Sequence, residues 1–343
     1  MCYQVRAAVW AVVSVVAVSS TSSALNQVLA YVPNYTDGTV SVIDTATNVV
    51  VDTVLVGLNP DGVAVSPQGD RVYVVNQTGE SISVIDTASN TVVGTVAVGW
   101  HPRGIAIDPD GSRAYVANTY DGTLSIVDTA TLTEVSSPVA CYYASYITVL
   151  PNGSRVYVSC WEYGQVSVMD ADTGGVLSTI NVGNNPLGLV ATPDGAKVYV
   201  ANSTSNTVSV IDTTTDTVTA TIDVETFPFG VAVHPSGDRV FVTNHMNAGL
   251  TVIETATDSV LTTIAVGWWP SGVSATPDGE MVYVANQFAD SVSVVDTTSN
   301  TTVDTIPVGV RPAALGQFIA RISLVFADGF ESGDLSGWSS SSP

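Results

Sequence analysis

Few residues of this 343-residue chain have the type and spacing that catalysis or metal binding requires. The three histidines, His101, His234 and His245, form no H-x-x-x-H pair, and no glycine-rich phosphate cradle follows a strand pattern. No Cys–His or Ser–His–Asp set converges, and no loop carries the dense carboxylate spacing of a Ca²⁺ site. The sequence therefore predicts no catalytic set, no metal site and no cofactor.

Aromatic, histidine and arginine side chains form a second group that could bind a ligand. They interrupt otherwise repetitive loops: Trp100, His101, Arg103, Tyr120, Tyr142, Tyr143, Trp161, Tyr163, Phe227, His245, Trp268, Trp269, Phe288 and Arg311. Exposed aromatic rings beside arginine are typical of recognition surfaces, and such rings can also stack on sugars. The alternative is that these rings pack between neighbouring elements and cover the ends of the core.

The elements that carry these loops repeat with a strict period of 42 residues. Three series share this period: a proline series from Pro60 to Pro312, an asparagine series from Asn34 to Asn286, and an aspartate series from Asp44 to Asp296. Ala144 and Cys160 replace the proline and the asparagine in one unit, and Glu254 replaces one aspartate. A fixed period of this length indicates a repeat architecture.

Each unit contains four short strand patterns, which we name A to D in chain order. In one unit they are 188–192, 197–202, 207–212 and 217–224, separated by tight-turn sequences such as Pro193-Asp194-Gly195. Connections this short predict an antiparallel meander, and four strands in about 42 residues are typical of a β-propeller blade.

The ends of the repeat indicate how the ring closes. Six complete units follow an amino-terminal B–C–D fragment at 29–56, and a single A strand follows them at 312–320. We therefore predict an all-β, seven-bladed β-propeller with four antiparallel strands per blade, in which the carboxy-terminal A strand joins the amino-terminal B, C and D strands. An open β-solenoid is the alternative, but it would not explain the complementary ends.

The units resemble the YVTN-type β-propeller repeat family. The resemblance covers about residues 28–320 and rests on Tyr31-Val32-Pro33-Asn34, Tyr73-Val74-Val75-Asn76, Tyr115-Val116-Ala117-Asn118, Tyr199-Val200-Ala201-Asn202, Phe241-Val242-Thr243-Asn244 and Tyr283-Val284-Ala285-Asn286. It implies a bacterial secreted, periplasmic or cell-surface protein, and it implies no particular activity.

The predicted fold places the candidate residues on one rim. The D–A and B–C loops share that rim, and they carry the aromatic residues named above. Turns on the opposite rim hold 17 of the 31 acidic residues, a pattern that ordinary turn chemistry and solubility explain. The A strands, taken to begin at the residues 62, 104, 146, 188, 230, 272 and 314, contain no charge, histidine or cysteine. We therefore expect no chemistry on the axis.

Cys141 and Cys160 depart from the repeat within one unit, where they replace a glycine and an asparagine. Strands A and B flank the turn at residues 151–153, which brings the two cysteines to the same end of the blade. In an exported protein such a pair predicts a disulfide, and two buried thiols are the alternative.

The amino terminus reads as a signal peptide over residues 1–24. Arg6 precedes an apolar run from Ala7 to Val18, and Ser22-Ser23-Ala24 offers a small-residue cleavage site; a buried strand or helix is the alternative. We expect the propeller to span residues 25–320 and a flexible tail, with a Phe330-Glu331-Ser332-Gly333-Asp334 element, to span 321–343.

Composition limits the partners. The formal charge is −22 and the chain has one lysine, which excludes a protein that binds nucleic-acid phosphates. No apolar run after the signal reaches the length of a membrane span. We expect a monomer that binds an unidentified protein or glycan.

The main functional expectation is therefore an exported, non-enzymatic binding or cell-surface module that uses the aromatic rim. Two alternatives remain open: a lactonase- or lyase-like propeller enzyme, and a purely structural envelope or surface-layer component.

Overall fold

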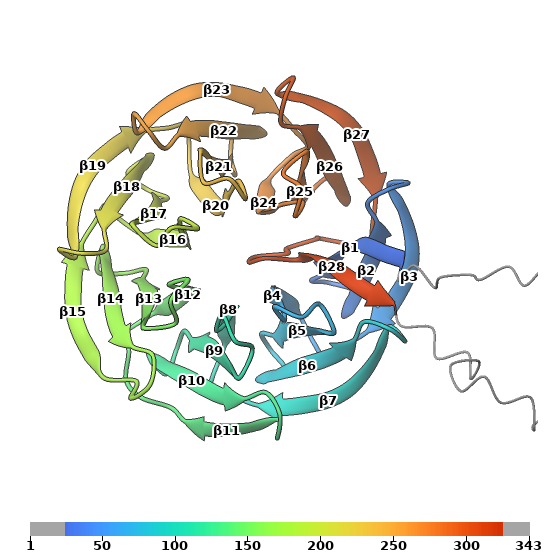
Figure 1. The fold of residues 1–343 in the computed structure, drawn as a ribbon, viewed down its shortest axis with the longest axis horizontal. Helices are drawn as coiled ribbons and strands as arrows, with labels where there is room; N and C mark the ends of the chain where they lie inside the picture. Colours follow the sequence, from blue (N-terminus) through green and yellow to red (C-terminus); the bar gives the residue numbers. More distant parts are fainter. Residues whose placement is uncertain (1–24, 325–343) are drawn as a thin grey trace, which may run out of the picture. The chain divides into compact units, whose positions relative to one another are not determined.

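The computed structural model describes residues 25–324, which form seven four-stranded antiparallel sheets arranged as a ring (Figure 1). The predicted all-β, seven-bladed propeller is confirmed. Within each blade the strands run in the order A, B, C and D from the axis outward. Strand A of blades 1 to 7 is β28 (Ile319–Leu324), β4 (Pro60–Val65), β8 (Pro102–Ile107), β12 (Ala144–Val149), β16 (Pro186–Ala191), β20 (Pro228–Val233) and β24 (Pro270–Ala275). Strand B is β1 (Leu25–Asn34), β5 (Arg71–Asn76), β9 (Arg113–Asn118), β13 (Arg155–Cys160), β17 (Lys197–Asn202), β21 (Arg239–Asn244) and β25 (Met281–Asn286). Strand C is β2 (Thr39–Asp44), β6 (Ser81–Asp86), β10 (Thr123–Asp128), β14 (Gln165–Asp170), β18 (Thr207–Asp212), β22 (Gly249–Glu254) and β26 (Ser291–Asp296). Strand D is β3 (Val49–Leu55), β7 (Thr91–Ala97), β11 (Thr133–Ser136), β15 (Val176–Asn181), β19 (Thr217–Asp223), β23 (Ser259–Ala265) and β27 (Thr301–Pro307).

The core lies between neighbouring blades. Strands B and C are buried along most of their length because both faces pack against adjacent sheets, whereas strand D is mostly exposed. β-branched residues suit these doubly covered strands, and one large ring per blade fills the wedge, as Tyr73, Tyr115 and Tyr199 do in β5, β9 and β17. No helix in residues 25–324 is long and apolar enough to span a membrane.

The asparagine at the end of strand B is a buried hydrogen-bonding centre. Asn76 Nδ2 donates to Ser81 Oγ at 3.1 Å and to Ser83 Oγ at 2.9 Å, and its Oδ1 accepts from the Gly57 amide at 3.0 Å. A Cβ at Gly57 would lie 2.5 Å from Asn76 Cγ, so the glycine and the asparagine depend on each other. The asparagine series is therefore structural.

Basic residues at the start of strand B clamp five of the seven blades to the next blade. The Arg113 and Arg155 guanidinium groups donate to the Ala171 and Thr213 carbonyls, each at 3.0 Å, and Lys197 Nζ donates to the Thr255 carbonyl at 2.8 Å. Arg71 and Arg239 do the same. Met281 holds this place in blade 7 and Leu29 holds it in blade 1, so the two seams that flank blade 1 have no such clamp.

The carboxy-terminal strand closes the ring, but not with the predicted residues. Pro312 bridges Asn34, as the anchor prolines do in other blades, but Leu315 and Gln317 then cross to β4, where their carbonyls accept from the Val63 and Val65 amides. Pairing with β1 resumes at Phe318, whose carbonyl accepts from the Tyr31 amide at 2.8 Å.

The inner strand β28 therefore runs from Ile319 to Leu324, and the prediction of strand A at 312–320 is wrong in its position. The reason is the detour of residues 314–317, which the 42-residue period does not contain. The predicted signal peptide at 1–24 and residues 325–343 of the predicted tail lie outside the described residues.

Candidate active site at the axial mouth

One residue of each blade follows the anchor position, which is a proline in six blades and Ala144 in blade 4. These residues lie at the end of the ring that carries the aromatic rim, which we call the axial mouth. These seven residues are Asp61, Arg103, Ser145, Leu187, Phe229, Ser271 and Ala313. Because the inner strands begin at the proline rather than two residues later, Asp61 and Arg103 belong to β4 and β8. The expectation that strand A carries no charge is therefore wrong. The sequence could have singled out Asp61, because it is the one carboxylate among the seven equivalent residues.

Asp61 and Arg103 form an ion pair under the mouth. Arg103 Nε donates to Asp61 Oδ2 at 3.3 Å, and the side chains are 26% and 4% exposed. Gln77 Nε2 reaches the same carboxylate oxygen at 3.5 Å, and the Tyr35 hydroxyl donates to Gln77 Oε1 at 2.7 Å. A buried carboxylate is therefore held in one position by donors from blades 2 and 3, with Tyr35 of blade 1 behind them.

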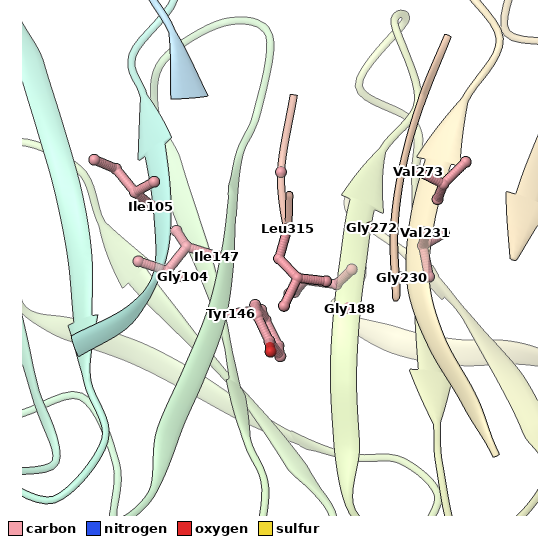
Figure 2. A pocket seen from close by; sticks show the side chains of 12 residues that line it. Gly104, Ile105, Tyr146, Ile147, Gly188, Gly230, Val231, Gly272, Val273 and Leu315 are labelled. Atoms are coloured by element: carbon pink, nitrogen blue, oxygen red, sulfur yellow. The ribbon is translucent and has the colours of Figure 1, made fainter. Parts of the chain in front are cut away.

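Tyr146 fills the axis where five other blades have glycine. Those glycines let neighbouring A strands approach closely: a Cβ at Gly104 would lie 2.6 Å from Tyr146 Cα. The Arg103 guanidinium lies 5.4 Å from the Tyr146 ring centroid, within cation–π range. Figure 2 shows the ring beside Leu315, with its hydroxyl turned away from that residue. The buried hydroxyl has no hydrogen-bond partner among the described residues.

The electrostatics of this cluster keep Arg103 charged and Tyr146 neutral. Burial by itself would lower the pKa of Arg103, but Tyr146 and Asp61 beside it raise that pKa above its ordinary value. Burial raises the pKa of Tyr146, against the opposing effect of Arg103.

His101 adds a neutral imidazole at the edge of the cluster. Burial, followed by the charge of Arg103, lowers the pKa of His101 below 6.5. Its ring lies 4.3 Å from Tyr120, and its buried Nδ1 has no partner among the described residues. Neutral imidazole can accept or donate a proton near pH 7.

The D–A loops hold one residue per blade in the left-handed backbone region. These residues are Asn59, His101, Tyr143, Asn185, Phe227, Trp269 and Arg311, with φ between 51° and 59°. Asparagine tolerates this conformation, whereas bulky side chains in it cost of order 1–3 kcal/mol each. The strain is concentrated at five of the predicted rim residues.

The predicted rim residues form two arcs of touching rings. The first contains Trp100, His101, Tyr120, Tyr142, Tyr143, Trp161 and Tyr163, with ring centroids 4.3–6.2 Å apart. The second contains Phe227, His245, Trp269 and Phe288, and it ends at Arg311, which lies 5.5 Å over Phe288. Trp268 is outside both arcs and is 70% exposed. The structure thus brings most predicted residues together by packing while leaving many rings partly exposed.

The predicted disulfide between Cys141 and Cys160 is confirmed, with Cα atoms 5.9 Å apart. It lies next to Tyr142 and Trp161 in the chain, so it fixes the two loops that carry the first arc.

The arrangement offers acid–base and electrophilic groups rather than metal ligands. No group of three or more histidine, cysteine or carboxylate side chains in residues 25–324 could hold a metal ion. Asp61 and His101 can move protons, and Arg103 can stabilise a developing negative charge on oxygen.

Comparison with known proteins gives one family match and many structural matches. Residues 25–141 match the model of the family described as lactonase, 7-bladed β-propeller. A search of curated proteins finds no match.

Three solved structures illustrate the structural similarity. Hydrazine synthase from Kuenenia stuttgartiensis is 24% identical, with a TM-score of 0.72 over 78% of this chain and 92% of that chain. A protein of unknown function from Desulfotomaculum acetoxidans is 15% identical, with a TM-score of 0.73 over 85% and 100%. The 6-phosphogluconolactonase candidate of Bacteroides fragilis is 16% identical, with a TM-score of 0.71 over 88% and 99%.

These matches correct the main functional expectation. The match of residues 25–141 to the lactonase propeller model overturns the non-enzymatic binding module and favours the lactonase-like alternative. The structural neighbours, all below 25% identity, show the fold alone. The chain is a seven-bladed β-propeller whose amino-terminal part resembles the lactonase propellers.

Proposed function

We propose that the chain is a lactonase-like hydrolase that opens a cyclic ester at the axial mouth. The buried Asp61–Arg103 pair is the observation that carries the proposal, because it is the one place where the inner strands of residues 25–324 bear a cation and an anion in contact. The family match and the neutral His101 beside the pair support it.

The chemistry follows from the positions of these groups. Asp61 accepts a proton from a water molecule as that water attacks the lactone carbonyl carbon. Arg103 stabilises the negative charge that develops on the carbonyl oxygen. The ring C–O bond then breaks, and the leaving oxygen takes the proton back from Asp61, which yields a hydroxy acid and restores the carboxylate. The two aromatic arcs supply surfaces on which the substrate ring can lie.

The test is hydrolysis of a panel of γ- and δ-lactones, followed by acid release at constant pH. We expect Asp61→Asn and Arg103→Lys to reduce kcat/KM by about 10²–10³. The matched controls are Asp216→Asn and Arg155→Lys, an ion pair of 3.0 Å on the opposite rim, and they should retain activity. The proposal is wrong if no lactone turns over, or if the Asp61 and Arg103 variants match the wild type.

We also propose that the protein is exported and belongs with the YVTN-type repeats. Arg6 and the apolar run after it support export, as does the Cys141–Cys160 disulfide, a bond that is rare in reducing compartments. Amino-terminal sequencing of protein recovered outside the cytoplasm tests this: a mature chain beginning at Leu25 supports it, and an intact Met1 contradicts it.

A further inference from the structure

The axial channel contains a large cavity on the side away from the aromatic rim. It has a volume of about 660 Å³, within the range typical of small-molecule sites. Its lining comes from the inner strands and A–B turns of the ring, from Ala64 in blade 2 round to Arg321 in blade 1. The cavity shares no charged residue with the Asp61–Arg103 pair.

Two departures from the repeat close the inner end of this cavity. Tyr146 stands where most blades have glycine, and Leu315 belongs to the detour between Ala313 and Gln317. Leu315 packs in one apolar cluster with Tyr146, Leu189 and Phe229, which belong to blades on the other side of the axis. Figure 2 shows Leu315 beside the Tyr146 ring. A remnant of about 40 Å³ lies at this level. The channel is therefore a blind pocket rather than a through-passage.

The pocket wall combines a band of branched apolar side chains with the polar side chains of Ser66, Thr148, Ser274 and Gln317. Half-buried branched side chains line it: Val65, Ile107, Val149, Val190 and Val233. Proline residues of the A–B turns form a rigid collar around the opening: Pro67, Pro109, Pro193, Pro235 and Pro277. Two of the wall hydroxyls are already engaged, since Ser66 Oγ donates to Asp70 and Thr148 Oγ1 accepts from the Ala191 amide. The band of branched side chains gives an apolar chain a surface to lie against.

The charge around the opening determines which ligand charge the pocket favours. Within the lining, Asp108 and Arg321 balance each other. The same turns carry six further acids, Asp70, Asp110, Asp194, Asp238, Asp278 and Glu280, and five basic residues that bind the next blade follow them: Arg71, Arg113, Arg155, Lys197 and Arg239. The C–D turns of the same rim add Asp44, Asp86, Asp128, Asp170, Asp212, Glu254 and Asp296. This end of the ring is therefore net negative, which attracts a cation and repels an anion.

We propose that this blind pocket binds a single-chain amphiphile with a cationic head. The apolar chain lies along the axis against the valine and isoleucine wall, and the head remains at the acidic turns. Apolar burial supplies the affinity, and the field of the turns supplies the preference for a cation. This inference is independent of the proposed lactone site.

The experiment is calorimetric titration of the full chain, below the critical micelle concentration, with three dodecyl probes: dodecyltrimethylammonium, dodecyl maltoside and laurate. We expect one site per chain, with the cationic probe binding about tenfold or more tightly than laurate and the maltoside in between. Added salt should reduce this preference because it screens the turn charges.

Two channel-filling variants, Val190→Phe and Ala275→Phe, locate the site. Each should weaken binding of the cationic probe at least about tenfold. Val303→Phe, on the exposed strand β27, is the matched control and should bind as the wild type does. Because the two channel variants lie on different blades, one that folds, as judged by its melting curve, is sufficient. Equal affinity for laurate, unchanged binding by a folded channel variant, or absence of a single saturable site would each overturn the proposal.

Discussion

His245 shows how one side chain links the aromatic rim to stability. It is 6% exposed, its ring lies 4.8 Å from both Phe229 and Trp269, and its Nδ1 lies 3.0 Å from the Pro270 carbonyl. Burial lowers the pKa of His245 below its ordinary value of 6.5, against the opposing effect of the Pro270 carbonyl. The folded state therefore favours the neutral imidazole.

This pKa shift predicts a pH dependence of the free energy of unfolding. Between the folded pKa and 6.5 the unfolded state binds more protons, so stability is complete above 6.5 and falls as the pH decreases through this window. We expect His245→Phe to lose less stability than the wild type between about pH 7 and pH 5. Urea unfolding at the two pH values measures this. The lowered pKa of His101 acts in the same direction, so its contribution remains in both proteins. Equal losses in the wild type and the variant would contradict the assignment.

The Cys141–Cys160 disulfide replaces a side-chain network in one blade. In blade 2 the amide of Asn76 binds Ser83 Oγ, but in blade 4 Cys160 stands in place of the asparagine. The equivalent hydroxyl, Ser167 Oγ, is buried with no partner among the described residues. The covalent bond thus offsets an unsatisfied polar group.

This exchange predicts the effect of restoring the repeat. Replacing both cysteines by alanine should lower the free energy of unfolding by about 3 kcal/mol, as expected for a loop of this length. Cys141→Gly with Cys160→Asn should recover about 1–2 kcal/mol of that loss, because the amide of the introduced asparagine would reach Ser167 Oγ. Guanidinium unfolding of both double variants measures the difference. If the glycine–asparagine pair is no more stable than the alanine pair, the network explanation is wrong.

The strands were predictable because the strict period repeats their pattern in blade after blade. The same regularity explains what was missed. The detour at Leu315 adds residues in the one unit whose strand A stands alone, with no neighbouring strand pattern to fix its register. Asp61 was excluded because strand A was taken to begin at Gly62, while the register shift after Pro60 extends the strand to the proline. The rim residues were placed correctly by the loop assignment, but their contacts depend on rotamers that the sequence does not encode.

At the scale of the whole molecule, β28 holds the ring together. It completes the sheet of blade 1, and the segment that leads into it carries buried side chains at Leu315, Phe318, Ile319 and Ile322. Each such side chain contributes about 1.5–3 kcal/mol, and their sum is comparable to the total stability of about 5–15 kcal/mol of a typical protein.

Truncation tests this closure. A chain that ends at Arg311 should lose cooperative unfolding, because β1 would have an unpaired inner edge and the axial pocket would lose Leu315. A chain that ends at Leu324 retains the whole described ring and is the control. Thermal unfolding followed by circular dichroism distinguishes them. A cooperative transition of the shorter chain at the melting temperature of the longer one would show that β28 is dispensable.

The missing clamps on both sides of blade 1 also decide where the molecule opens first. At the other five seams a basic side chain of one blade donates to a carbonyl of the next. At the two seams of blade 1 the tyrosine hydroxyls remain: Tyr283 contacts the Thr45 carbonyl at 3.3 Å, and Tyr31 donates to Asn90 Oδ1 at 3.0 Å. Backbone amides in blade 1 should therefore exchange with deuterium sooner than those in blade 5, and exchange should spread from blade 1 to blades 7 and 2. The ring is continuous in space, but its local unfolding begins at one place and proceeds from there to the neighbouring blades.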